Sequence, residues 1–79
     1  MGRYYRMSKQ VTYEEEKEIL RELKELENVK RAELTDERKC LLVETKDNDY
    51  SKVMYAAVNI CNRIGKGCEI TFTKFELEK

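Results

Sequence analysis

Residues 29–45 read VKRAELTDERKCLLVET, and this stretch decides the fold. Two runs rich in apolar and β-branched residues flank a polar stretch around Thr35, Asp36 and Glu37. Such a pattern is typical of two strands joined by a tight turn. The stretch therefore predicts a β-hairpin in the middle of the chain, and the segments on either side decide which fold contains it.

Residues 3–7 predict a short strand before the hairpin. Their side chains alternate weakly, so Tyr5 and Met7 fall on one face of the strand and Tyr4 and Arg6 on the other. This strand is the first element of the predicted order.

A helix is expected between this strand and the hairpin, beginning at Thr12 and ending near Glu27 or Asn28. Thr12 is followed three residues later by Glu15, which is the capping-box pattern of a helix start. The apolar residues that follow recur at helical spacing and form one stripe: Ile19, Leu20, Leu23 and Leu26.

A second helix and a last strand are expected after the hairpin. Asp47, Asn48 and Asp49 have side chains that favour a helix start, and Gly65 favours a helix end. The apolar positions between them are Val53, Met54, Ala57, Val58, Ile60, Cys61 and Ile64. Residues 68–75 then alternate, which predicts an inward face made of Cys68, Ile70 and Phe72.

The order strand, helix, strand, strand, helix, strand predicts an α+β, ferredoxin-like fold. We expect a four-stranded antiparallel sheet with both helices on one face and the other face open to solvent. The chain shows no repeat and no linker-like stretch, so residues 1–79 are expected to form a single domain.

Composition argues against several classes of function. The 79 residues include 16 Lys or Arg, 16 Asp or Glu and no His. Without His the chain cannot build Ser-His or Cys-His catalysis or a His-containing zinc site, so we expect no enzyme. A net charge of zero gives no overall attraction to nucleic acid. No segment approaches the roughly 20 apolar residues of a membrane span. Three cysteines without a Cys-x-x-Cys pair favour a reduced, cytoplasmic setting.

The predicted topology brings several chemically capable side chains to one end of the sheet: Thr12, Glu15, Asp36, Cys40, Cys61 and Cys68. Cys61 and Cys68 are expected to point into the layer between helices and sheet, whereas Cys40 is expected on the open face. Two interpretations of the buried pair stay open. The thiols are inert core residues, or they form a pair that holds a soft metal ion, Zn, Cd or Cu(I), with help from Glu15.

RNA binding on the open sheet face is a weaker alternative. That face is expected to present Tyr4, Arg6, Thr71 and Thr73, with basic side chains nearby. The strand RKCLLVET has no aromatic residue on which a base could stack, so the RNA-recognition signature is absent.

Two longer stretches resemble the heavy-metal-associated domain, in particular the one found at the N-terminus of cadmium- and zinc-type P-type cation-transporting ATPases. LRELKELENVKRAEL is similar to that family's first helix and second strand, with Asn28-Val29 where Gly-Val is usual. VETKDNDYSKVMYAAVNICNRIGKGCEITF is similar to the third strand, the second helix ending in a Cys, and a second Cys before the last strand.

The resemblance implies a lost metal site. In that family a Cys-x-x-Cys pair at the start of the first helix binds the metal, and the matching positions in this sequence are Thr12 and Glu15. The expectation is therefore a degenerate, non-catalytic relative without a cofactor, acting as a regulatory or protein-interaction module. Its expected partner is another protein or the rest of a larger transporter chain.

Overall fold

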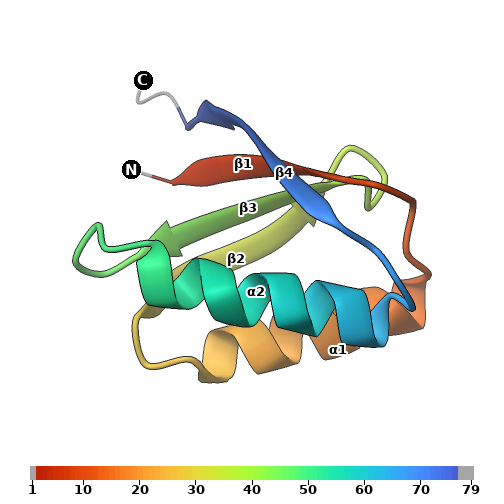
Figure 1. Ribbon diagram of the computed structural model, residues 1–79, viewed down its shortest axis with the longest axis horizontal. Helices are drawn as coiled ribbons and strands as arrows, with labels where there is room; N and C mark the ends of the chain where they lie inside the picture. Colours follow the sequence, from red (N-terminus) through yellow and green to blue (C-terminus); the bar gives the residue numbers. More distant parts are fainter. Residues whose placement is uncertain (1, 77–79) are drawn as a thin grey trace.

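The computed structural model describes residues 2–76 and has the predicted order of elements (Figure 1). These elements are β1 (Arg3–Met7), α1 (Tyr13–Glu25), β2 (Val29–Thr35), β3 (Cys40–Thr45), α2 (Ser51–Ile64) and β4 (Ile70–Phe75). The strands form one antiparallel sheet in the order β2-β3-β1-β4. The two helices lie side by side against one face of it (Figure 1). The α+β, ferredoxin-like fold is confirmed.

The hairpin that decides the fold closes through an unusual backbone conformation. Asp36, Glu37 and Arg38 all have positive φ, at 53°, 56° and 66°. Left-handed conformations are uncommon for residues with a Cβ atom. Two hydrogen bonds hold the turn, because the Lys39 N–H donates to the carbonyls of both Thr35 and Asp36 at 3.2 Å.

Helix α1 starts where the sequence predicts and ends earlier than expected. Thr12 is the N-cap, and the capping box with Glu15 is present. The helix ends at Glu25 rather than near Glu27 or Asn28, because Leu26 is already extended (φ −70°, ψ 130°). This turn of the chain lets the Val29 N–H bond to the Leu26 carbonyl at the entry to β2.

The start of helix α2 differs in detail from the prediction. Tyr50 is the N-cap and makes no capping hydrogen bond with its side chain. Asp49 stabilises the start instead, since its carboxylate accepts hydrogen bonds from the Ser51 N–H at 3.1 Å and the Ser51 hydroxyl at 2.9 Å. Gly65 ends the helix as predicted.

The core lies between the sheet and the helices. It contains Tyr5, Met7, Val11, Ile19, Leu23, Val29, Ala32, Leu41, Val43, Tyr50, Val53, Ala57, Ile60, Cys61 and Cys68. Two residues predicted to face inward are exposed instead: Val58 is 45% exposed and Phe72 is 44% exposed. Val58 follows the buried Ala57 by one residue, which turns it about 100° away from the buried face of α2.

Strand β4 begins at Ile70, so Cys68 lies in the connection before it, and the strand does not keep the strict alternation expected of residues 68–75. Tyr4 lies opposite Lys74 while Tyr5 lies opposite Phe72, so Thr73 is an extra residue, a β-bulge. A bulge shifts the parity of every later side chain. Phe75 therefore lies on the helix-bearing face with Phe72, opposite Arg3.

The second face of the sheet is less open than predicted. Leu42, on this face, is only 3% exposed. Arg31 forms ion pairs with Glu33, Glu44 and Glu76 at 3.3, 3.3 and 2.5 Å, and the Glu76 carboxylate also accepts from the Gly2 N–H. These groups cover one half of the face.

Within residues 2–76, neither helix has the length and apolar character needed to cross a membrane.

Candidate functional site

The predicted end of the sheet does gather the loops that carry the candidate residues. The Gln10 side chain donates to the Glu37 carbonyl at 2.7 Å, and the Arg38 guanidinium donates to the Val11 carbonyl at 3.1 Å. The Cys68 thiol lies 3.8 Å from the Lys9 carbonyl. The hairpin turn, the β1–α1 loop and the connection between α2 and β4 therefore meet at one end of the molecule.

Thr12 and Glu15 are hydrogen-bonded to each other. The Thr12 hydroxyl accepts from the Glu15 N–H at 3.1 Å, and the Glu15 carboxylate accepts from the Thr12 N–H at 2.8 Å. A ligand that displaced either of these two hydrogen bonds would weaken the cap of α1, which is worth about 1 kcal/mol. The geometry at these positions is that of a helix start.

We predict that Thr12→Ala lowers the free energy of unfolding by about 1 kcal/mol, because one orphan N–H of α1 then loses its acceptor. Urea denaturation measures this change. Thr12→Ser keeps a hydroxyl at the same position and should stay close to the parent protein. Equal stability of the alanine variant would contradict a capping role.

Cys61 and Cys68 are brought together inside the core, as predicted. Both are free and fully buried, at 0% exposure. Burial, and to a lesser extent the neighbouring Cys68, raises the pKa of Cys61 to about 12. The Cys61 thiol is therefore protonated at neutral pH, and a protonated thiol is a poor metal ligand. Cys40 is only partly buried and lies in β3, opposite Arg6 of β1.

The third candidate ligand does not complete a set with the two cysteines. Among residues 2–76 no group of three or more His, Cys, Asp or Glu side chains is placed to hold a metal ion. Glu15 is held by the cap described above. The residues predicted as metal ligands thus share one end of the fold without forming a coordination sphere.

The open sheet face divides into a basic part and an acidic part. Tyr4 lies on it with the Lys74 ammonium 5.4 Å from its ring centroid. Arg6, Lys9 and Lys39 line a shallow cavity of about 320 Å³ at one end. The ion-paired cluster around Arg31 covers the other half. RNA binding on this face stays a prediction; Tyr4 is the aromatic residue that could stack on a base.

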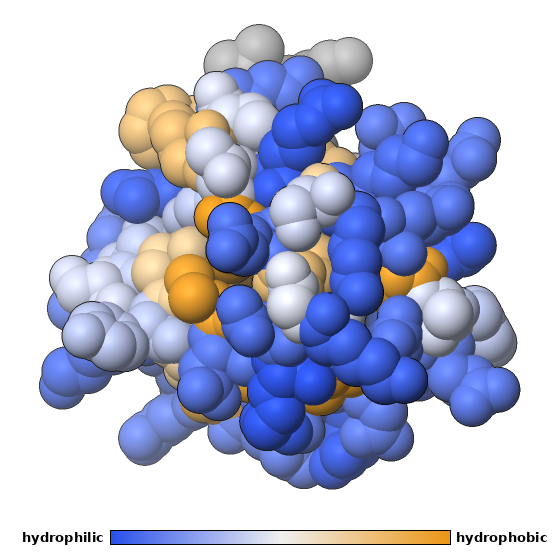
Figure 2. All heavy atoms as spheres, turned by 45° about the vertical axis from the view of Figure 1, so that its right-hand side comes forward, coloured by the Kyte–Doolittle hydropathy of each residue, from blue (hydrophilic) through white to orange (hydrophobic). Residues whose placement is uncertain are grey.

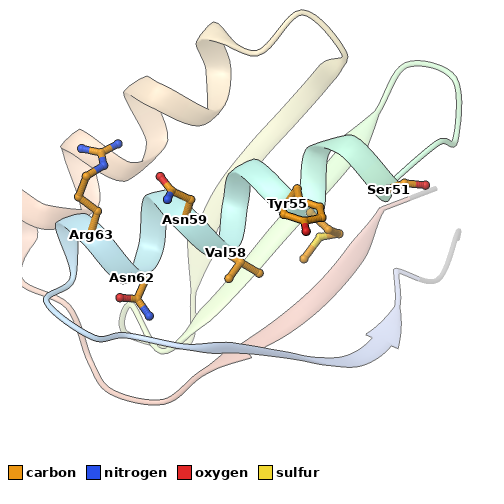
Figure 3. Close-up of a pocket in the computed structure, with 7 residues that line it drawn as sticks. Ser51, Tyr55, Val58, Asn59, Asn62 and Arg63 are labelled. Carbon is orange, nitrogen blue, oxygen red and sulfur yellow. The ribbon is translucent and has the colours of Figure 1, made fainter.

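A second surface, which the sequence did not reveal, lies on the outer side of α2 and the adjoining β4. We call it the α2–β4 surface and define it as Met54, Tyr55, Val58, Phe72 and Phe75. Tyr55 is 87% exposed and Phe75 is 51% exposed. The α2 residues line an open groove of about 580 Å³. Val58 and Asn62 project from α2 on the side of β4, whereas Arg63 points toward α1, where it pairs with Glu22 (Figure 3).

Arg3 connects the two halves of this surface. Its guanidinium lies 4.0 Å from the ring centroid of Tyr50, 5.4 Å from that of Phe75 and 6.0 Å from that of Phe72. Arg3 and Met54 also line the same shallow cavity. Hydrophobic side chains interrupt an otherwise largely hydrophilic exterior (Figure 2). Such a cluster of exposed aromatic and apolar residues beside one arginine resembles the central part of a protein interface.

One signal in the sequence could have indicated this surface. The apolar residues of α2 cover an arc wider than one buried stripe, because Met54, Tyr55 and Val58 fall outside the arc of Val53, Ala57 and Ile60. The contribution of Phe75 could not be foreseen, because it depends on the bulge at Thr73.

Comparison of the chain with protein-family models, with curated proteins and with solved structures gives no match, so the resemblance to heavy-metal-associated domains stays a prediction.

Proposed function

We propose that this chain is a non-catalytic protein-interaction module, a degenerate relative of the heavy-metal-associated domains of cation-transporting ATPases, which binds a protein through its α2–β4 surface. The observation that carries the proposal is the capping box of Thr12 and Glu15, the two positions that the resemblance matches to the metal-binding pair of such domains.

The loss of metal binding is supported by the state of the polar groups at that end. At the two positions that the resemblance matches to the family's thiolates, the Thr12 hydroxyl and one oxygen of the Glu15 carboxylate accept hydrogen bonds at the α1 N-terminus. The two remaining candidate thiols are buried, and the raised pKa of Cys61 keeps it protonated. Binding a soft metal there would require deprotonation of a buried thiol and rearrangement of the core.

The choice of a protein as partner is supported by the α2–β4 surface. β4 is an edge strand, paired only with β1 within residues 2–76. Its backbone can therefore pair with another strand, and aromatic side chains on the same strand add apolar contact area. Nucleic acid and small polar ligands do not need a free strand edge combined with exposed aromatic side chains in order to bind.

The test is a titration of the fully reduced protein with Zn²⁺, Cd²⁺ and Cu(I), followed through backbone amide shifts. We predict no saturable shifts at residues 10–16 or 60–69 at stoichiometric metal, because binding would have to deprotonate the buried Cys61 thiol and open the core around it. The titration is made on Cys40→Ser, which removes the more exposed thiol and its adventitious metal binding.

The same titration on Cys40→Ser combined with Cys61→Ser and Cys68→Ser gives the control. Saturable shifts that vanish in this triple variant would overturn the proposal and establish an altered metal site at the buried pair.

A further inference from the structure

Resting on the proposed interaction function, we infer that the partner on the α2–β4 surface is a second copy of this chain, paired β4 to β4 about a two-fold axis that passes between Thr73 and Lys74. The result would be one continuous eight-stranded antiparallel sheet. The four helices would then lie on the same face of that sheet.

The bulge in β4 favours a copy over an unrelated strand. If a regular strand paired with the outer edge of β4, one of its residues would have to lie opposite two residues of β4 at the Thr73 bulge. A second β4 carries the same extra residue at the same place. With the axis between Thr73 and Lys74, each residue opposes one residue of the copy throughout the bulge.

This register also matches the side chains. Phe72 opposes Phe75 of the copy, and both residues lie on the helix-bearing face. Because of the two-fold symmetry, the interface contains this Phe72–Phe75 pair twice. Cross-strand aromatic pairs are among those that stabilise antiparallel strands. In each of these pairs, the Phe72 ring also contacts Tyr5 of its own copy edge to face, with the ring centroids 5.8 Å apart. The Phe75 ring of the other copy lies beside Arg3 of that copy.

The charges of β4 agree with the same arrangement. Lys74 opposes Thr73 of the copy, and Glu76 opposes Thr71. No like charges face each other directly. Moving the axis onto Lys74 would oppose two ammonium groups, which is unfavourable.

The exposed side chains of this surface supply about half of the area that a standard interface buries per partner. Tyr55, Val58, Phe72 and Phe75 are between 44% and 87% exposed. Side chains of this size with these exposures present on the order of 400 Å² per copy. The β4 backbone, Met54 and Asn62 add further area to the interface.

The experiment is sedimentation of the whole chain over concentrations from about 1 µM to 1 mM. We expect a reversible monomer–dimer equilibrium. Phe75→Lys should weaken dimerisation about 25-fold, because two symmetry-related contacts are lost, each worth about fivefold in affinity. Tyr13→Glu is the matched control, since Tyr13 is 63% exposed at the start of α1 and outside the proposed interface, and it should leave dimerisation unchanged.

A mixing experiment tests the register itself. An acidic chain with Phe72→Glu and Phe75→Glu, and a basic chain with Phe72→Lys and Phe75→Lys, should each be monomeric, because like charges then face each other twice. An equimolar mixture should recover a heterodimer. In the unmodified protein, isotope-filtered NOEs between the Phe72 ring of one copy and the Phe75 ring of the other give a measurement that does not depend on the folding of any variant.

A monomer throughout the concentration range, or a dimer without the Phe72–Phe75 NOEs, overturns the inference. Such a result leaves the metal titration untouched, so failure of the dimer is distinguishable from failure of the proposed function.

Discussion

Replacing both buried cysteines in the double variant Cys61→Ser with Cys68→Ser is expected to lower the free energy of unfolding by about 2–4 kcal/mol. The reason is burial: both side chains are at 0% exposure, and a hydroxyl is more costly than a thiol to remove from water. The Cys68 position offers the Lys9 carbonyl as an acceptor, with the present sulfur 3.8 Å away. The Cys61 position should therefore contribute the larger part of the loss.

Urea denaturation with an unchanged m-value measures this loss. Cys40→Ser is the matched control, because that residue is only partly buried in β3 and its substitution should change stability little. A double variant as stable as the parent protein would mean that the two thiols are hydrated. That result would remove one of the two arguments against metal binding at this pair.

The parts of the fold that could be predicted from the sequence are those decided by local chemistry. The capping box of Thr12 and Glu15 needs only two residues at a fixed spacing, and the hairpin needs only a polar break between two apolar runs. The burial of Cys61 follows from periodicity within α2, and Cys68 is buried as well, in the connection before β4. These predictions are confirmed.

The features that could not be predicted depend on how the strands and helices are positioned relative to one another. The bulge at Thr73 places Phe75 beside Phe72, with ring centroids 5.1 Å apart, although strict alternation would separate them. The exposure of Val58 depends on how α2 is rotated over the sheet, which the apolar pattern alone leaves undefined. The α2–β4 surface is the product of these two tertiary features, and the proposed interaction depends on it.

The sequence predicts that Gly65 ends helix α2, but it does not predict why a glycine is needed at this position. A helix-ending glycine usually supplies a left-handed conformation, but Gly65 has φ −80°, which any residue can adopt. Its importance is steric. A Cβ atom at this position would lie 2.6 Å from the Cys61 carbonyl oxygen and 2.6 Å from the Cys68 Cβ atom. The absence of a side chain lets the chain after α2 return close enough to bury Cys68.

Gly65→Ala is therefore expected to lower the free energy of unfolding by about 2–3 kcal/mol, because both clashing atoms belong to or adjoin the backbone and cannot move alone. Backbone amide shifts should change at residues 60–69 and around Val11, which a Cβ atom would approach to 3.5 Å. Urea denaturation and an amide spectrum measure the two effects.

Gly67→Ala separates the steric cause from the conformational one. Gly67 has φ +96°, but a Cβ atom there would meet nothing within 4 Å. Its substitution should cost about 1 kcal/mol through backbone strain, with amide shifts confined to its neighbours. If Gly65→Ala were the milder of the two variants, the close approach of α2 to Cys68 would not be required. The burial of the cysteine pair, and with it the case against metal binding there, would then need another cause.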